Sequence, residues 1–249
     1  ILATITPDML MPHCASLVED GLGAKRAAAF DLLAGCSGFI YALATAYQFI
    51  SSGAYNNILV VGSDVMSRII NWGDRDTCVL FGDGAGAVLV QASEHPSGPF
   101  SFVLGSDGSG AELLYAPGIC GRPSNSPRDG QYYLRMNGKE VFRFAVSSMA
   151  DATRKAVDAA GLNMSDIELL IAHQANERII QAVSRSLRLP MERVFMNIER
   201  YGNTSAASIP MALSDAIEQG RINEGDLVAL VAFGSGLSWA AMVLQWNKL

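Results

Sequence analysis

Two long stretches of the chain carry no charged side chain, and both are interrupted by glycine. The first covers residues 32–63 and the second covers residues 227–246. Each is long enough to cross a bilayer. However, Gly35-Cys36-Ser37-Gly38 interrupts the first and Gly234-Ser235-Gly236 interrupts the second, so neither can form one continuous apolar helix. We therefore predict buried strands and a buried helix of a many-layered soluble protein, with no membrane span.

Apolar segments typical of strands alternate with segments typical of helices, which indicates an α/β fold. The strand at 27–33 is expected to be covered on both faces, and residues 93–130, rich in Gly, Pro and Ser, are expected to form a connector. The remaining strands are predicted at 57–64, 81–92 (after a glycine turn), 168–173, 193–198, 226–236 and 238–246, and the helices at 36–51, 138–160, 174–187 and 205–219.

The two halves of the chain repeat one pattern. A strand and a glycine turn lead to Cys36 in the first half and to Asn203 in the second, ILVVGSD resembles LVALVAFGSG, and AGAVLVQ resembles WAAMVLQ. We predict a duplicated α/β unit, with residues 1–95 as the first half and residues 96–249 as the connector and second half. The first half is expected to be incomplete, because nothing before Ala27 supplies the strands that the second half has ahead of RVFMNI.

Composition excludes several classes of protein. The 249 residues are 50% hydrophobic and only 17% charged, which excludes a disordered chain. The net charge of −6 gives no global attraction for nucleic acid. The four cysteines form no CxxC pair, so we expect free thiols in a reducing compartment. The start contains Thr4, Thr6, Pro7 and Asp8 with no basic leader, so no secretory signal is expected.

Three polar residues stand where strands are predicted to end and helices to begin. Cys36 lies in AGCSGF, where a helix N-terminus would stabilise a thiolate, although buried cysteines often only fill space. His173 ends the strand ELLIAH, at the sheet edge where α/β proteins bind ligands, although a lone histidine can be a core residue. Asn203 in YGNTSAAS can be a simple helix cap. The three together favour a catalytic site.

Other catalytic motifs are either absent from the sequence or followed by the wrong type of element. GDGAGA is followed by the strand residues Val88 and Val90 and not by a helix, so it is not a dinucleotide fingerprint. GxxxxGK[ST], HExxH, GxSxG and ligand-spaced His/Cys clusters are absent from the sequence, so we expect neither a metal nor a nucleotide cofactor. Cys, His and Asn in this order also describe papain-like proteases, but AGCSGF does not match the sequence around their cysteine.

The order of seven motifs resembles a known family. DLLAGCSGFIYAL, VVGSD, DRDTCVLFGDGAGAVL, MNGKEVFRFAV, AHQANERII, YGNTSAASIP and AFGSGLSW closely resemble β-ketoacyl-acyl-carrier-protein synthase III of type II fatty acid synthesis. The resemblance covers essentially the whole chain, and HQAN and GNTSAAS are specific to it. It implies the thiolase fold, a duplicated α/β unit in five layers (αβαβα). The family also has a front portion before the region that matches Ile1.

The resemblance implies a decarboxylative Claisen condensation without a cofactor. Cys36 would take an acyl group, with acetyl as the expected one, from acyl-CoA, and His173 and Asn203 would stabilise the enolate formed from malonyl carrier protein. Backbone N–H groups of Cys36 and Ser235 would form the oxyanion hole, although the family often has glycine where Ser235 stands. The alternatives are a related condensing enzyme of secondary metabolism and an inactive binding subunit or fragment. Biosynthetic thiolase is disfavoured, because it uses a second reactive cysteine near the C-terminus and the last cysteine here is Cys120.

The resemblance also assigns contacts with substrates and partners. Met11 falls where the family reaches across a homodimer interface into the partner's acyl pocket. The expected location is the cytoplasm, or an organelle matrix such as the plastid stroma, and neither nucleic acid nor membrane is an expected partner. The acyl-CoA contacts would be Arg75, Phe142, Asn176, Arg178 and Phe233, and carrier protein would dock on Arg143, Arg178 and Arg185.

Overall fold

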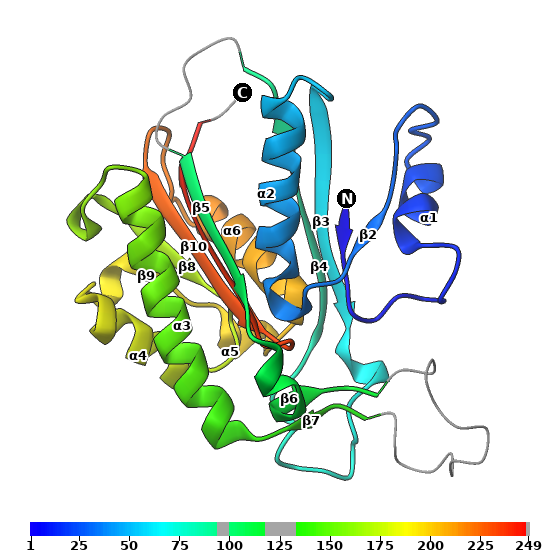
Figure 1. Cartoon of the computed structure of the whole chain (residues 1–249), viewed down its shortest axis with the longest axis vertical. Helices are drawn as coiled ribbons and strands as arrows, with labels where there is room; N and C mark the ends of the chain where they lie inside the picture. The colour runs from blue at the N-terminus through cyan, green and yellow to red at the C-terminus, as the bar shows by residue number, and fades with distance from the viewer. Residues whose placement is uncertain (94–99, 118–132, 248–249) are drawn as a thin grey trace.

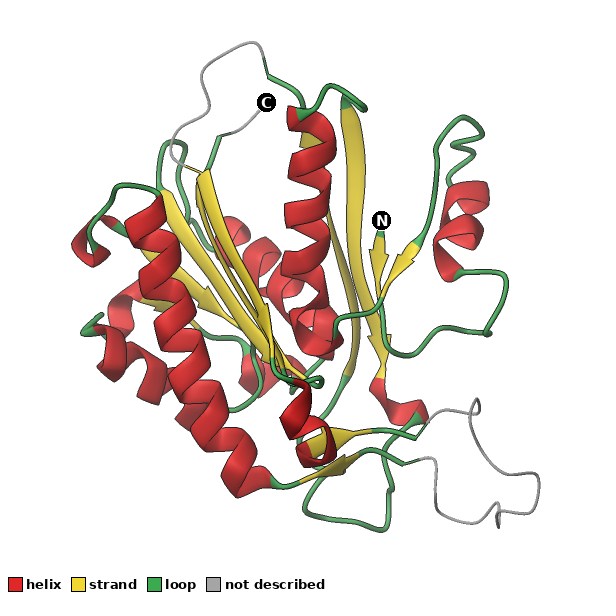
Figure 2. Ribbon diagram, viewed as in Figure 1, coloured by secondary structure: helices red, strands yellow, loops and turns green. Residues whose placement is uncertain are grey.

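The protein folds around two β-sheets that face each other across a layer of helices. The computed structural model describes residues 1–93, 100–117 and 133–247. The helices α2 (Gly38–Ser51) and α6 (Ser208–Glu218) lie between the sheets, as Figures 1 and 2 show. The helices α3 (Gly138–Ala159) and α4 (Glu177–Leu187) cover the outer face of one sheet, and α1 (Cys14–Gly21) lies outside the other. These are the five layers expected from the sequence.

The sheet of the second half has five strands in the order β5-β11-β10-β8-β9. Strand β10 runs parallel to β8, and β8 runs parallel to β9, while β11 runs antiparallel to both β10 and β5. The strands are β5 (Phe100–Ser106), β8 (Leu169–Ala172), β9 (Val194–Phe195), β10 (Leu227–Gly234) and β11 (Ser238–Gln245).

The sheet of the first half repeats this topology with one strand fewer among the described residues. Its order is β2-β1-β3-β4, which corresponds strand for strand to β9-β8-β10-β11. The strands are β1 (Leu2–Ala3), β2 (Asp31–Leu32), β3 (Asn57–Val65) and β4 (Asp83–Gln91). The predicted duplication is therefore confirmed in strand order and direction. Since β5 pairs with β11, we propose the boundary between the halves at residues 95 and 96.

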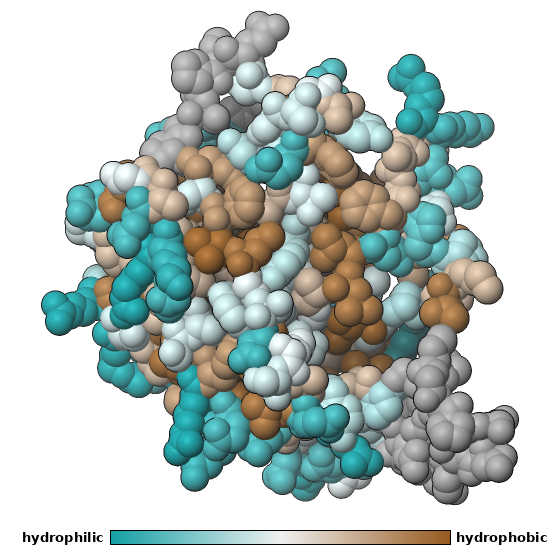
Figure 3. Space-filling view, in the orientation of Figure 1, coloured by the Kyte–Doolittle hydropathy of each residue, from teal (hydrophilic) through white to brown (hydrophobic). Residues whose placement is uncertain are grey.

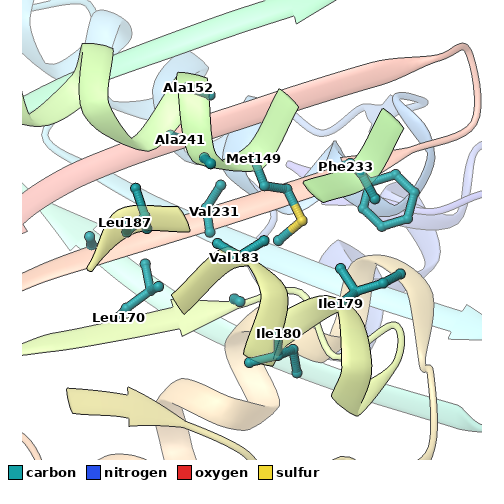
Figure 4. Close-up of a cluster of buried hydrophobic side chains, with 14 of the residues drawn as sticks. Met149, Ala152, Leu170, Ile179, Ile180, Val183, Leu187, Val231, Phe233 and Ala241 are labelled. Carbon is teal, nitrogen blue, oxygen red and sulfur yellow. The ribbon is translucent and has the colours of Figure 1, made fainter. Parts of the chain in front are cut away.

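The described residues form two buried cores, one beside each of two helix layers. One core lies between the sheets around Phe39, Ile40 and Ile209. The other lies between the second sheet and the outer helices, where one face of α4 packs against α3, β8 and β10 (Figure 4). The buried face of α4 is the predicted one: Ile179, Ile180, Val183 and Leu187. Hydrophilic side chains gather over α3 and α1 at the sides of the view, and hydrophobic ones gather over α2 and β5 in the middle (Figure 3).

Four sequence predictions need correction. A strand does precede Ala27: β1 pairs with both β2 and β3, and its two residues are too short a run for an apolar pattern to reveal. The strand predicted at 27–33 is reduced to β2, which pairs with β1 alone and is half-exposed. The carboxylate of Asp31 in this strand accepts hydrogen bonds from the backbone N–H groups of Cys14 and Ala15 at the start of α1. The sequence analysis does not predict the helix α1, because its eight residues are fewer than the window over which helical periodicity can be recognised. The segment predicted as a connector contains β5, which is completed only by pairing with β11.

Short 3-10 turns and small strands complete the described chain. The turns that matter for the site are η1 (Gly35–Ser37) and η6 (Ser205–Ala207), which lead directly into α2 and α6. The others are η2 (Met66–Arg68), η3 (Gly108–Leu113), η4 (Met164–Asp166), η5 (Met191–Arg193), the short helix α5 (Ile198–Tyr201), and the hairpin strands β6 (Leu114–Tyr115) and β7 (Arg135–Met136).

Candidate active site

Cys36, His173 and Asn203 line one cavity. Cys36 lies in η1, His173 follows β8, and Asn203 precedes η6, so the two halves of the fold both contribute. The cavity has a volume of about 520 Å³, and all three residues are buried in its wall. Its walls are mainly apolar, with Met66, Ile69, Leu80, Phe81, Leu114, Leu134, Met136 and Val141 among the lining residues.

Close backbone contact between η1 and the end of β10 fixes the position of Cys36. Gly35 has φ +58°, and a Cβ atom added there would lie 2.9 Å from the backbone nitrogen of Ser235. A Cβ atom on Gly234 would lie 2.5 Å from the backbone nitrogen of Cys36. A hydrogen bond of 2.7 Å between the hydroxyls of Ser37 and Ser238 holds the same two segments together. The predicted oxyanion-hole residues are therefore neighbours in space.

The Cys36 thiol lies in a strongly desolvated place. Burial raises the pKa of Cys36 to about 12, and the charge of Asp64 adds to this increase, whereas a hydrogen bond from Ser205 lowers the pKa. Cys36 lies in η1, two residues before the first residue of α2, so it adjoins the helix N-terminus expected from the sequence. Burial acts against that position and disfavours the charged form of the thiol.

His173 is neutral at physiological pH. Burial lowers the pKa of His173 to about 3, so the imidazole cannot carry a proton on both nitrogens. Its Nδ1 lies 2.5 Å from the hydroxyl of Ser208, and that hydroxyl oxygen accepts a hydrogen bond from the backbone of Gln174. Among the described contacts, the Ser208 hydroxyl can donate its own proton to Nδ1 of His173. This arrangement leaves the proton of His173 on Nε2, where it can be donated to a ligand.

Asn203 is held by contacts on both its backbone and its side chain. Its backbone N–H donates to Leu80, and its backbone carbonyl accepts from Gly82. Its Oδ1 accepts a 2.9 Å hydrogen bond from the backbone N–H of Ser205. Because the oxygen is identified by this donor, the other end of the amide is the NH₂ group. The cavity is thus lined by a buried thiol and two neutral groups that donate through N–H, a pair able to stabilise negative charge on a ligand oxygen.

Asp64 is a buried residue of the site region that sequence patterns did not identify. It ends the motif VVGSD and has no exposed surface. One carboxylate oxygen accepts hydrogen bonds from the hydroxyls of Thr4 and Thr6 and the backbone of Ile5. The other accepts from the backbone N–H of Ala206 in η6. Asp64 therefore connects the first sheet to the turn that carries Asn203.

The remaining predicted ligand contacts divide into two groups. Phe142, Asn176, Arg178, Phe233 and Ser235 line the cavity, and Phe233 also lies edge-on to the His173 ring at 5.9 Å. Arg75 is exposed and is not among the lining residues, although its neighbour Asp76 is. Met11 is 80% exposed and does not line the cavity of its own chain.

The three arginines predicted to dock carrier protein are all exposed on outer helices. Arg178 and Arg185 lie on the face of α4 opposite its buried side chains, as predicted. Asn176 caps the N-terminus of α4 by accepting a 2.8 Å hydrogen bond from the backbone of Arg178. Arg143 on α3 forms an ion pair of 3.3 Å with Glu140.

Residues 1–93, 100–117 and 133–247 contain no cluster of three or more His, Cys, Asp or Glu side chains that could hold a metal ion. In the same ranges, no helix has the length and apolar character needed to cross a membrane. Cys14, Cys36 and Cys78 are free thiols, and Cys120 lies outside the described residues.

Comparison with known proteins identifies the family. Residues 30–108 match the family described as 3-oxoacyl-[acyl-carrier-protein] synthase III, and residues 157–246 match the family described as its C-terminal part. A relative from Roseiflexus sp. (strain RS-1), named β-ketoacyl-[acyl-carrier-protein] synthase III, is 51% identical and covers 99% of this chain and 76% of its own. A Bacillus cereus relative, named β-ketoacyl-[acyl-carrier-protein] synthase III 1, is 48% identical, with 100% and 76% covered.

Solved structures agree with this assignment. The synthase III from Thermus thermophilus has a TM-score of 0.93 at 51% identity, covering 100% of this chain and 77% of that one. The priming β-ketosynthase of the R1128 polyketide pathway has the same TM-score at 36% identity, covering 99% and 74%. Together with the sequence matches, these similarities show that the chain belongs to the β-ketoacyl-acyl-carrier-protein synthase III family.

Proposed function

We propose that Cys36, His173 and Asn203 carry out the two half-reactions of a condensing acyltransferase that initiates fatty acid synthesis. The observation that carries this proposal is that one buried thiol and two neutral donors line a single, mainly apolar cavity. An acyl chain fits such walls, and Arg178 near the mouth suits the phosphates of coenzyme A. The function itself follows from membership of the family.

In the first half-reaction, Cys36 takes an acyl group from acyl-CoA, with acetyl-CoA as the expected donor. The sulfur attacks the thioester carbon, a new carbon–sulfur bond forms, and coenzyme A leaves as a thiolate that takes up a proton from solvent. The backbone N–H groups of Cys36 and Ser235 stabilise the tetrahedral oxyanion. The tight contact of Gly35 and Gly234 with these two residues supports this role.

In the second half-reaction, malonyl carrier protein loses carbon dioxide and forms an enolate. The Nε2–H of His173 and the NH₂ of Asn203 donate to the enolate oxygen, and the enolate carbon then attacks the acyl group on Cys36. The neutral state of His173 and the oriented amide of Asn203 support this pairing. The lost carboxylate supplies the electron pair for the new carbon–carbon bond, so the reaction needs no cofactor.

Acyl-CoA contacts follow the cavity towards its mouth. Phe142, Asn176 and Phe233 contact the pantetheine arm and acyl chain, and Arg178 contacts a phosphate. Arg75 contacts the nucleotide end at the entrance, a role supported by the position of Asp76 in the cavity wall. Acyl carrier protein docks on the exposed arginines Arg143, Arg178 and Arg185.

The chain acts as a homodimer in the cytoplasm, or in an organelle matrix. The half-exposed edge strand β2 supports self-association, because an unpaired edge is open to pairing with another chain. Leu10, Met11 and Leu33 near it are each more than three-quarters exposed, which supports insertion of Met11 into the acyl pocket of a second copy. The free thiols of Cys14, Cys36 and Cys78 support a reducing compartment.

Intact mass after incubation with acetyl-CoA tests the first half-reaction. We expect one acetyl adduct on Cys36, none in Cys36→Ala, and unchanged adducts in Cys14→Ala, Cys78→Ala and Cys120→Ala. Loss of the adduct in a folded Cys120→Ala variant would contradict the assignment of the nucleophile.

Decarboxylation of malonyl carrier protein tests the division of roles. His173→Ala and Asn203→Ala should keep the acetyl adduct but lose decarboxylation by about 10²–10³-fold, as for removal of an oxyanion donor. Decarboxylation near the wild-type rate in either variant would show that enolate stabilisation does not depend on that residue.

A further inference from the structure

Ser205 contacts two of the residues to which the catalytic steps are assigned. Its side chain is completely buried, and its hydroxyl donates to the sulfur of Cys36 at an oxygen–sulfur distance of 3.4 Å. Its backbone N–H donates to the amide oxygen of Asn203. One residue from the second half therefore contacts the nucleophile of the first half and orients the amide of the second half.

The backbone of Ser205 has a conformation that favours glycine. Its φ is +52°, which is uncommon for a residue with a side chain. The repeat shows the alternative: η1 leads into α2 as η6 leads into α6, so Ser205 corresponds to Gly35, whose φ is +58°. The second half thus has a hydroxyl-bearing side chain at the position where the first half has glycine, and that hydroxyl reaches the sulfur of Cys36.

Among the described residues, no Lys or Arg side chain is buried beside Cys36. Asp64 on β3 is close enough for its charge to raise the pKa of Cys36, so it disfavours a thiolate. His173 after β8 is neutral, Tyr41 on α2 donates its hydroxyl proton to the carbonyl of Gly105, and β10 and β11 contain no Asp, Glu, Lys, Arg or His. Asp76 and Arg178 line the same cavity on exposed segments. A hydrogen bond to the sulfur is therefore a principal stabilising contact for its charged form.

We propose that Ser205 is a further catalytic residue, whose hydroxyl donates a hydrogen bond to the thiolate of Cys36 when the sulfur attacks the thioester and again when it leaves. The proposal rests on the proposed function, because it concerns the nucleophile of that reaction. The proton of the thiol passes to solvent, and the bond to Cys36 forms first and gives the tetrahedral oxyanion. The carbon–sulfur bond to coenzyme A then breaks as the oxyanion collapses, and the released coenzyme A thiolate takes up a proton. Ser205 keeps its own proton throughout.

The pH dependence of alkylation of Cys36 by iodoacetamide tests the proposal without acyl-CoA or carrier protein. The alkylated residue is identified by peptide mass, since Cys14, Cys78 and Cys120 also react. In Ser205→Ala, we expect an upward shift of about one pH unit in the alkylation profile, and about tenfold slower alkylation at any pH below the titration.

Two further variants separate the hydroxyl from backbone effects. Ser205→Gly also lacks the hydroxyl, but glycine adopts the positive φ without strain. It should therefore shift the pH profile of Cys36 alkylation as far as Ser205→Ala does, and it takes the place of Ser205→Ala if that variant does not fold. Ser101→Ala removes another buried hydroxyl, bound to the carbonyl of Ala156 far from the cavity, and should leave alkylation unchanged.

The outcomes decide between the catalytic and structural roles. A common shift in Ser205→Ala and Ser205→Gly, with none in Ser101→Ala, supports the proposal. Unchanged alkylation in either Ser205 variant, or an equal shift in Ser101→Ala, overturns it. Because alkylation needs no substrate, failure of the acetyl-adduct experiment would count against the proposed function and leave this test valid.

Discussion

Substitution of Asp64 by Asn should weaken the contact between the two halves of the fold. The carboxylate has two acceptor oxygens, and each serves a different segment: one accepts from residues 4–6 and the other from the backbone of Ala206. An amide has one oxygen and one NH₂ group. Whichever way the Asn side chain is turned, its NH₂ must face a backbone N–H, either that of Ala206 or that of Ile5.

The expected cost follows from the number of buried donors left without an acceptor. The hydroxyls of Thr4 and Thr6 can rotate, so Asp64→Asn leaves one backbone N–H unpaired, at a cost of about 1–3 kcal/mol. Asp64→Ala leaves the N–H groups of both Ile5 and Ala206 unpaired and opens a cavity, so its cost should be about twice as large. For a chain of this size, a loss of about 2 kcal/mol lowers Tm by roughly 4–8 °C.

Denaturant and thermal unfolding measure these losses, and Asp83→Asn is the matched control. Asp83 on β4 also accepts from a backbone N–H and a hydroxyl, both from Ser67, but it is exposed to water. Its substitution should cost about 0.5 kcal/mol or less, because water replaces the lost acceptor. Equal losses in Asp64→Asn and Asp83→Asn, or a smaller loss in Asp64→Ala than in Asp64→Asn, would refute the reasoning from unpaired donors.

Two further measurements test the electrostatics of the site and its surface. Burial lowers the pKa of His173 in the folded protein below its value in the unfolded chain, so the unfolded state takes up a proton first as pH falls. The free energy of unfolding should therefore fall by about 1.4 kcal/mol per pH unit between pH 6.5 and about 3. Denaturant unfolding at pH 7 and pH 5 should show this contribution missing in His173→Asn and kept in His13→Asn, which removes an exposed imidazole; equal slopes in both variants would contradict it. Reversal of charge in Arg178→Glu with Arg185→Glu should weaken use of malonyl carrier protein and flatten its dependence on ionic strength, with less effect on acetylation of Cys36. Steady-state rates at several salt concentrations measure this effect, and equal damage to both half-reactions would exclude α4 as the docking face.

Periodicity and uncharged runs were sufficient to predict the buried elements of the fold. Helices at 36–51 and 138–160 and strands at 57–64 and 226–236 are present close to the predicted bounds, because their burial requires a strong apolar pattern. Elements whose stability comes from pairing or capping were missed or misjudged. The strand β5 depends on β11, the helix α1 depends on the carboxylate of Asp31, and the edge position of β2 depends on its neighbour β1.

The site illustrates the same limit at the level of single residues. The sequence comparison of the two halves placed Asn203 opposite Cys36, but the turns η1 and η6 put Ala206 at the position of Cys36 and Ser205 at the position of Gly35. Cys36 and Asn203 meet because the two turns approach each other from different sheets, not because they occupy equivalent positions. A sequence pattern does not show which turns of different sheets come together, because this depends on contacts between distant segments, such as Gly234 with Cys36 and Asp64 with Ala206. Residues that join the halves can therefore be recognised only once both turns are seen together.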